Sequence, residues 1–420
     1  MKDAFELPFV QCMLAWMSKN GMSKYFAYLC RTLLPAVSMF LLFSIPSLKL
    51  IHSSNIINLG VSGLLFVSLI VNYKSNLRKF RSLCFVILFF YFFIKTIQLL
   101  NSADILVNPI GYLSFGLLEL IDFVYLLIIF FIIAYLANLD RLRMAGVLIF
   151  FWGIILAVWQ LSVGIPTDRD LGQHYLTISM PVGAALAYSL SIAFCCSIKV
   201  WKRLFYVAAG LLLFFAIASL LSRSGMIFPL VVVFFFIVGS MVFNKGMKLS
   251  NKIFVLLFIG IILVLFFVFI VPTVEFQQLD RLMRIAENIS DEPRIRLYME
   301  AMDLILQRPI FGYGTGSAFG HYYHNIFLDI LVMGGLVLFV PFFIFVVSYF
   351  CCLKNILKYK LHDSKLIGFA AASLMLFMQF NTSFSFRNAY ISVGAMVLLC
   401  LAVYDFKCTR LSNSFRLIVK

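Results

Sequence analysis

The sequence predicts an all-α polytopic membrane protein with about twelve transmembrane helices of about 20 residues each and one large helical loop. Of its 420 residues, 63% are hydrophobic and only 12% are charged. The mean hydropathy is +1.02. Water-soluble domains hold about twice that charged fraction, so a soluble fold is excluded. The net charge of +16 reflects basic residues in the loops on one side of the membrane, and we predict no nucleic-acid partner.

The predicted spans are apolar stretches long enough to cross a hydrocarbon core of about 30 Å. In chain order they cover 27–47, 54–73, 83–100, 113–137, 144–161, 175–198, 203–221, 225–243, 252–272, 324–352, 364–386 and 388–406. Two span assignments are open. The stretch 203–243 could pair into spans differently around Arg223, and the stretch 364–406 is broken only by a short polar segment. We treat residues 1–420 as a single membrane domain.

Basic residues predict the orientation, because cytoplasmic loops carry an excess of Lys and Arg. With the N-terminus inside, most of the 34 basic residues fall in the two tails and in alternate loops on one side. Both termini are therefore predicted to be cytoplasmic. The basic residues left on the outer side are nearly all arginines: Lys49, Arg169, Arg223, Arg281, Arg284, Arg294, Arg296, Arg308 and Arg387.

One long loop, 273–323, lies on the outer side and is predicted to cap the site of chemistry. We expect helices at 276–290 and 294–308, with Pro293 in the first turn of the second helix. Four glycines then predict an irregular turn: Gly312, Gly314, Gly316 and Gly320. Loops held by a rigid scaffold often carry function, and this loop crowds arginines and histidines into an otherwise apolar chain.

His324 stands where this loop re-enters the membrane, and Asn325 follows it. A neutral imidazole with a pKa near ~6.5 can accept a proton near neutrality, so His324 is a candidate general base. The competing interpretation is an interfacial histidine that caps a helix. His321, three residues earlier, shares its helix face only if the helix begins that early.

Arg223 lies in a short break between two apolar stretches. Arginine at membrane depth costs roughly 2.5–3.5 kcal/mol on insertion scales, so it normally has a partner. It could be a snorkelling residue on a tight turn, or a clamp whose guanidinium binds phosphate through two hydrogen bonds. Arg387 occurs in a similar break. Arg294 and Arg296 are two residues apart, so on a helix only one of them faces the site.

Asp168 and Asp170 flank Arg169 with the spacing of a carboxylate pair that can bind a metal ion. A solvated loop is the preferred interpretation, because the motif is short and common by chance. The sequence contains no cysteine or histidine set with metal-ligand spacing. We therefore predict neither a metal site nor a cofactor.

The order and sidedness of several motifs resemble those of the O-antigen polymerase and O-antigen ligase superfamily, the Wzy and WaaL proteins. The motifs that carry the resemblance are Arg169 with Gly172, Ser222-Arg223-Ser224-Gly225, Arg294 with Tyr298, Ala301, Pro309 and Gly312-Tyr313-Gly314, and His324-Asn325 with Leu328-Asp329 and Gly334-Gly335. Tyr298 stands where many relatives carry Trp. The resemblance covers mainly 160–340, and elsewhere only the topology is similar.

The resemblance implies an inverting, metal-independent glycosyltransferase at the periplasmic face of a bacterial inner membrane. The donor would be a glycan on undecaprenyl pyrophosphate, and the acceptor a sugar hydroxyl. Catalysis would fall to His324, Arg223 and Arg294. Substrate contacts would fall to Arg296, His321, Asn325, Arg387, Arg169 and Tyr298. Implied partners are the lipid-linked donor and acceptor, membrane lipid and a chain-length regulator protein.

Polymerase and ligase differ in the acceptor, which is a second lipid-linked repeat unit or the lipid A core. The segment from Tyr323 to Asp329 is more similar to the polymerases. A transporter or flippase for lipid-linked sugars is the alternative from another class. It should bury ionisable residues at the bilayer midplane, where the main candidates are Lys95, Glu119 and Asp122. Charge concentrates instead at the outer loop, which favours an enzyme.

Overall fold

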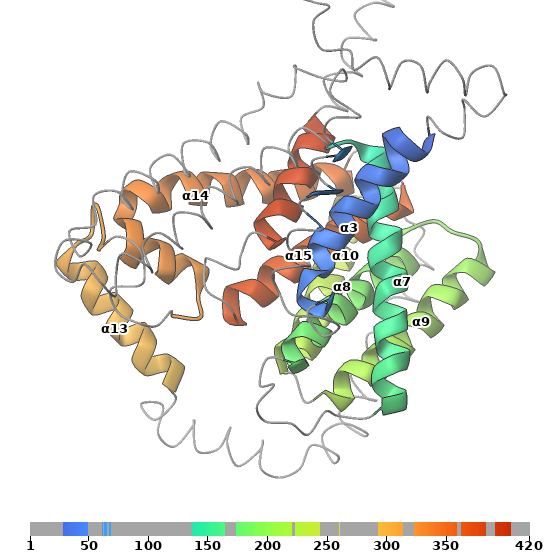
Figure 1. Ribbon diagram of the computed structural model, residues 1–420, viewed down its shortest axis with the longest axis horizontal. Helices are drawn as coiled ribbons and strands as arrows, with labels where there is room; N and C mark the ends of the chain where they lie inside the picture. Colours follow the sequence, from blue (N-terminus) through green and yellow to red (C-terminus); the bar gives the residue numbers. More distant parts are fainter. Residues whose placement is uncertain are drawn as a thin grey trace, which may run out of the picture.

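The computed structural model describes residues 28–48, 61, 63–64, 67–68, 137–163, 174–220, 223–243, 260, 293–313, 323–358, 363–383 and 391–404. Within these ranges all regular secondary structure is helical (Figure 1). Five of the described helices are long and apolar enough to cross a membrane. The chain is thus a helical membrane protein, as its composition predicts.

The described elements, in chain order, are η1 (Leu29–Leu33), α3 (Leu34–Leu48), α7 (Leu139–Val163), α8 (His174–Cys195), α9 (Val200–Ser219), α10 (Arg223–Phe243), α13 (Pro293–Gln307), α14 (Ile326–Lys358), α15 (Ser364–Ser383) and a shorter apolar helix, Ile391–Tyr404. The spans predicted over 27–47, over 144–243 and over 324–406 coincide with these helices. The spans at 54–73, 83–100, 113–137 and 252–272 lie almost entirely outside the described residues, so the count of twelve stays a prediction.

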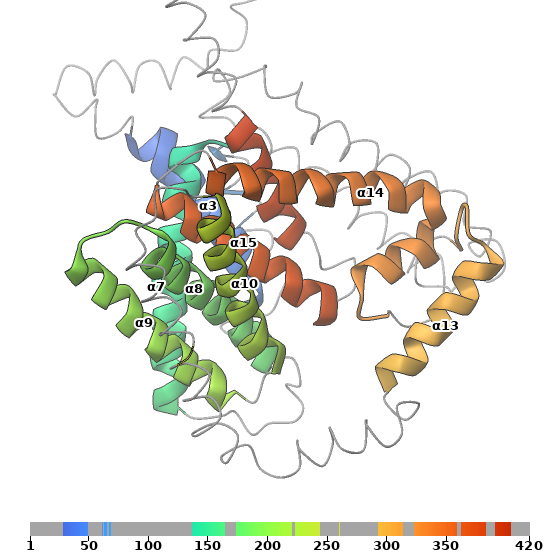
Figure 2. The same ribbon diagram turned by 180° about the vertical axis from the view of Figure 1, so that it is seen from behind.

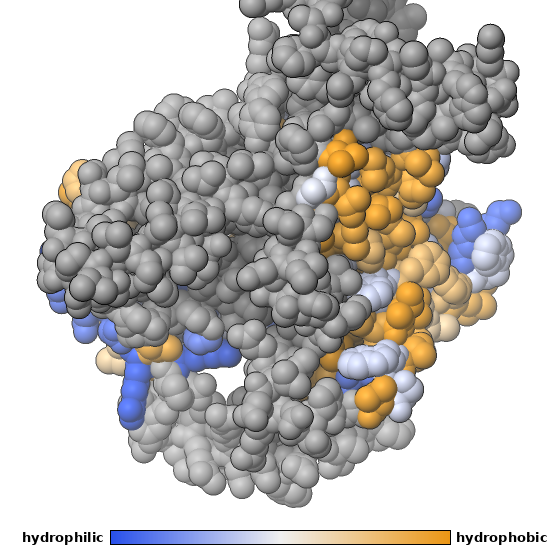
Figure 3. Space-filling model, viewed as in Figure 1, coloured by the Kyte–Doolittle hydropathy of each residue, from blue (hydrophilic) through white to orange (hydrophobic). Residues whose placement is uncertain are grey.

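Helix α8 forms the centre of the bundle, and α7, α9, α10 and α15 all contact it. Its Tyr188 is fully buried and stacks on Phe150 of α7, with ring centroids 5.4 Å apart. The small residue Gly153 of α7 comes close to Ala185 of α8, as is common where membrane helices pack tightly. The outer surface differs, because apolar side chains gather on the face over α3, α7 and α9 (Figure 3). Such a face suits lipid.

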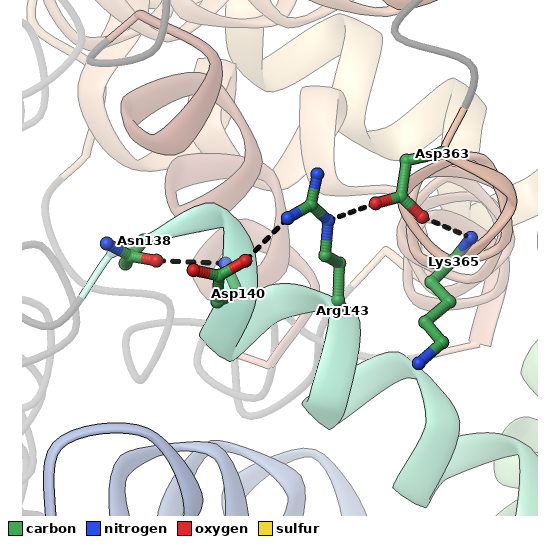
Figure 4. A network of polar contacts seen from close by, with 5 residues as sticks. All are labelled: Asn138, Asp140, Arg143, Asp363 and Lys365. Atoms are coloured by element: carbon green, nitrogen blue, oxygen red, sulfur yellow. Dashed lines mark hydrogen bonds and ion pairs between the residues drawn. The ribbon is translucent and has the colours of Figure 1, made fainter. Parts of the chain in front are cut away.

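A polar network joins the start of α7 to the start of α15 (Figure 4). Asn138 caps α7, since its Oδ1 accepts the backbone N–H of Asp140 at 2.8 Å. Arg143 forms ion pairs with Asp140 and with Asp363. Asp363 in turn accepts the backbone N–H of Lys365 at 2.9 Å. The two helices therefore start at the same end of the bundle, as the alternation of the predicted loops requires.

Helix α14 departs from the single uninterrupted span that the sequence predicts at 324–352. It is broken at Gly335, whose backbone has φ 55° and ψ −156°. The part after the break, 336–358, is long enough to cross a hydrocarbon core by itself at a rise of about 1.5 Å per residue. The part before it, 326–334, is a separate short helix.

Helix α13 is the described helix of the predicted loop, and it begins at Pro293 as the sequence predicts. It packs against α14, and Figures 1 and 2 show it apart from the bundle around α8. Hydrophilic side chains gather over it in Figure 3. The helix predicted at 276–290 lies outside the described residues.

Candidate functional site

His324 has a positive φ of 51°, unlike every other described residue except two glycines. L-residues other than glycine rarely adopt this left-handed backbone, although His, Asn and Asp do so more often than most. Such outliers persist where the surrounding structure fixes them, and they cluster at functional sites. The side chain is half-buried, and its Nδ1 atom is shielded from solvent.

Both neighbours of His324 are hydrogen-bonded to the first turn of α14. Asn325 caps the helix, because its Oδ1 accepts the backbone N–H groups of Phe327 at 3.0 Å and Leu328 at 3.3 Å. The buried carboxylate of Asp329 accepts the backbone N–H of Tyr323 at 2.8 Å. His324 thus sits between two anchored residues. The residue that caps α14 is therefore Asn325 and not His324. The contact of Asn325 with substrate stays a prediction.

Tyr323 anchors α13 to this turn. Its side chain is buried with Ala301 of α13 and Val332 of α14 in a small apolar cluster. Burial, with the nearby Glu300 and Asp329, raises the pKa of Tyr323 to about 12. The phenol is therefore neutral at any physiological pH. It packs the loop onto the helix and does not act as a base.

The register of α13 separates the two arginines that the sequence could not rank. Leu297, Ala301 and Leu304 pack in the cluster with Tyr323. Arg294 precedes Leu297 by three residues and Ala301 by seven, so it lies on the same helical face. Arg296 lies toward the opposite face. Both side chains are exposed, and Tyr298 is partly buried. Of the two arginines, Arg294 is the one on the helical face that packs against Tyr323.

The turn after α13 completes the hydrogen bonds that the break in α14 leaves open. Leu336 and Val337 donate their N–H groups to the carbonyls of Pro309 at 2.9 Å and Ile310 at 3.1 Å. In return, the carbonyl of Val332 accepts the N–H of Tyr313 at 2.8 Å. Buried backbone groups need such partners. The loop is therefore fixed to α14 by backbone contacts just beyond the His324 turn.

Gly335→Ala is expected to loosen this joint. The position has a positive φ, and a Cβ there would collide with the carbonyl of Ile310. Strain of this kind costs roughly 1–3 kcal/mol. Thermal unfolding in detergent should therefore show a lowered midpoint. Gly260→Ala is the control, because a Cβ at Gly260 meets nothing within 4 Å. Equal stability of the two variants would contradict this interpretation of the joint.

Arg223 is the first residue of α10, which confirms that the break in 203–243 falls between α9 and α10. Its side chain lies outside the described residues. The next residue, Ser224, accepts a hydrogen bond at its Oγ from Nε2 of Gln379 on α15, at 2.9 Å. Two residues further along α15, Oδ1 of Asn381 accepts the backbone N–H of Ile326 at 3.1 Å. The C-terminal end of α15 therefore contacts the starts of both α10 and α14.

Among the predicted site residues, the structure thus brings the start of α10, with Arg223, near the His324 turn and places Arg294 on the α13 face toward that turn. His321, Arg169 and Arg387 lie outside the described residues, as do Asp168 and Asp170. Sequence reasoning missed Gln379 and Asn381. The available signal was two amides near the end of an apolar span, where polar side chains normally have a partner.

Residues 207–343 match the model of the O-antigen ligase family. This segment runs from α9 to the break in α14 and a little beyond. It contains Arg223, Arg294, Arg296, Tyr298, His321, His324 and Asn325, while Arg169 and Arg387 fall outside it. The match confirms the resemblance to the polymerase and ligase superfamily in this part of the chain. No curated protein matches the chain.

The match over residues 207–343 supports a role in O-antigen glycan processing, and the apolar helices support a membrane protein. The family implies an enzyme of the glycosyltransferase or ligase type.

Proposed function

We propose that this protein polymerises O-antigen repeat units carried on undecaprenyl pyrophosphate, at the periplasmic face of the inner membrane. The observation that supports it best is the arrangement around the end of α15. The helix start that bears Arg223 and the turn that bears His324 both belong to the segment 207–343 that matches the family, and both are hydrogen-bonded to this one helix end. Both termini are cytoplasmic in this proposal.

Arg223 and Arg294 hold the donor in the proposed reaction. The bond between the anomeric carbon and the pyrophosphate oxygen breaks, and the pyrophosphate leaves with the bonding electrons. Pyrophosphate needs no protonation to leave, so the site needs groups that stabilise negative charge. Guanidinium groups do this in a low-dielectric site without a metal ion. Arg296, Tyr298, Arg169 and Arg387 are proposed as further substrate contacts.

His324 acts on the acceptor. The attacking sugar hydroxyl is a poor nucleophile, so a base that takes its proton as the new C–O bond forms accelerates the reaction. Attack on the face opposite the leaving pyrophosphate inverts the anomeric carbon. Nδ1 is shielded from solvent, so we propose that Nε2 is the atom that takes the proton from the hydroxyl. Asn325 and His321 are proposed to line the acceptor side.

The lipopolysaccharide of a deletion strain tests this function directly. Loss of a polymerase leaves core carrying a single repeat unit. Loss of a ligase leaves bare core while lipid-linked polymer accumulates. The ligase is the second candidate, favoured by the description of the matching family. A normal ladder in the deletion strain would contradict both candidates.

Activity is expected to persist in excess chelator, because the proposed chemistry uses arginines and no metal ion. The check is polymer formation by the purified protein with and without chelator. Asp168→Asn and Asp170→Asn are expected to keep activity as well. Loss of activity that a divalent ion restores would revive the carboxylate pair as a metal site and contradict the mechanism.

A further inference from the structure

We propose that Gln379 and Asn381 are positioning residues, which set the donor-binding arginine and the catalytic histidine at a fixed separation. The inference rests on the proposed function. It assigns to the C-terminal end of α15, residues 379–381, a task that neither the family match nor the sequence motifs assign. Gln379 acts through the start of α10, and Asn381 acts through the start of α14.

Gln379 is fully buried, and only one of the two polar groups of its side-chain amide forms a hydrogen bond within the described part of the chain. Its Nε2 donates to Ser224, whereas its Oε1 has no hydrogen-bond partner within the described part of the chain. A buried amide oxygen without a partner costs stability, and an apolar residue of the same shape would avoid that cost. The bond to Ser224, next to Arg223 in the chain, is therefore the contact from which we argue the role of Gln379.

Asn381 completes the N-terminus of α14. The first helical N–H groups of α14 are orphans that need outside acceptors. Asn325 accepts those of Phe327 and Leu328, and Asn381 accepts that of Ile326. Ile326 follows His324 by two residues. Asn381 thus fixes the helix start from which the strained His324 backbone departs, and it does so from a helix far away in the sequence.

The two side chains leave α15 in nearly opposite directions, because residues two apart on a helix differ by about 200°. Gln379 reaches α10, and Asn381 reaches α14. One rigid helix end therefore sets the spacing between the two halves of the site. Reactions between two bound substrates depend steeply on such spacing, and a misplacement of about 1 Å can cost about a hundredfold in rate.

The inference predicts different kinetic effects from the two positions, measured in proteoliposomes in which the lipid-linked polymer donor is varied at a saturating concentration of the lipid-linked acceptor repeat unit. Gln379→Met removes the bond to Ser224 and should raise the donor KM about tenfold or more and lower kcat as well, because the displaced arginine both holds the donor and stabilises the leaving pyrophosphate. Asn381→Leu should lower kcat about a hundredfold while donor binding is unchanged, because the histidine is displaced.

Conservative variants separate positioning from general packing. Ser224→Thr keeps the hydroxyl acceptor and should behave like wild type, whereas Ser224→Ala should reproduce Gln379→Met. The double variant should be no worse than either single one, as expected for two residues that act through one contact. Asn381→Asp keeps the acceptor oxygen and should restore most of the kcat that Asn381→Leu loses.

Ser373→Ala is the matched control on the same helix. It removes the buried hydrogen bond from Tyr349 to Ser373, at 3.2 Å, away from the proposed site. KM and kcat should both stay normal. If Gln379→Met is not recovered folded, Ser224→Ala carries the same test.

The positioning role is wrong if the variants at 379 and at 381 change KM and kcat in the same way, or if neither variant changes them. Arg223→Lys and His324→Ala in the same assay identify which claim fails. If they abolish transfer while the variants at 379 and 381 behave normally, only the positioning role is wrong. If Arg223→Lys and His324→Ala keep normal turnover, the proposed catalytic function itself is wrong.

Discussion

His324→Ala is expected to abolish glycan transfer and to leave donor binding intact. The physical reason is a division of labour, because the proposed base acts on the acceptor hydroxyl while the arginines hold the donor. Loss of a general base typically costs about 10²–10⁴-fold in rate. The measurement is product formation in proteoliposomes, alongside binding of the lipid-linked donor to the same preparation.

His321→Ala is the comparison for this experiment. It lies three residues before His324 and outside the anchored turn between Tyr323 and Asn325, so its loss should cost less. A His324→Ala protein with near-normal turnover would show that the base is assigned to the wrong residue. A variant that instead loses donor binding would place His324 on the donor side.

Arg223→Lys and Arg294→Lys should each cause a severe defect in transfer, although each keeps the positive charge. Lysine presents a single ammonium group, whereas arginine presents a planar fork that binds a phosphate through two hydrogen bonds. Removal of one preorganised group that stabilises a developing charge typically costs about 10²–10³-fold. The check is the rate of polymer formation at matched protein levels.

Arg203→Lys is the matched control, because Arg203 lies at the start of α9, the end away from the break that precedes Arg223. It should leave transfer unchanged. Arg296→Lys should be milder than Arg294→Lys, because Arg296 lies toward the opposite face of α13. Normal polymer from both the Arg223 and Arg294 variants would mean that neither arginine is a phosphate clamp.

Features set by local sequence could be predicted. Helix α13 begins at Pro293, because proline fits the first turn of a helix, where its missing N–H is not needed. The break before Arg223 was also predicted, since a polar Ser-Arg-Ser-Gly run interrupts two apolar stretches. Gly312 takes a positive φ in the turn after α13, as the glycine cluster indicates. Each of these follows from residues within a few positions of one another.

Features that depend on distant contacts could not be predicted. The break at Gly335 is hidden within a continuous apolar run, and it is stabilised by the carbonyls of Pro309 and Ile310, which belong to another segment. Gln379 pairs with Ser224 across 155 residues, and Asn381 pairs with Ile326 across 55. Spacing along the sequence carries no information about such pairs. The positive φ of His324 likewise depends on anchors at either side of it.

Reconstitution of the purified protein tests the central claim most directly. Proteoliposomes would contain undecaprenyl-pyrophosphate-linked repeat units as the only glycan, with no lipid A core and no added metal ion. We predict a ladder of lipid-linked polymer whose new glycosidic bonds have the anomeric configuration opposite to that of the donor. Absence of polymer, with transfer only after lipid A core is supplied, would contradict the polymerase and identify a ligase. New bonds that retain the donor configuration would contradict the mechanism itself.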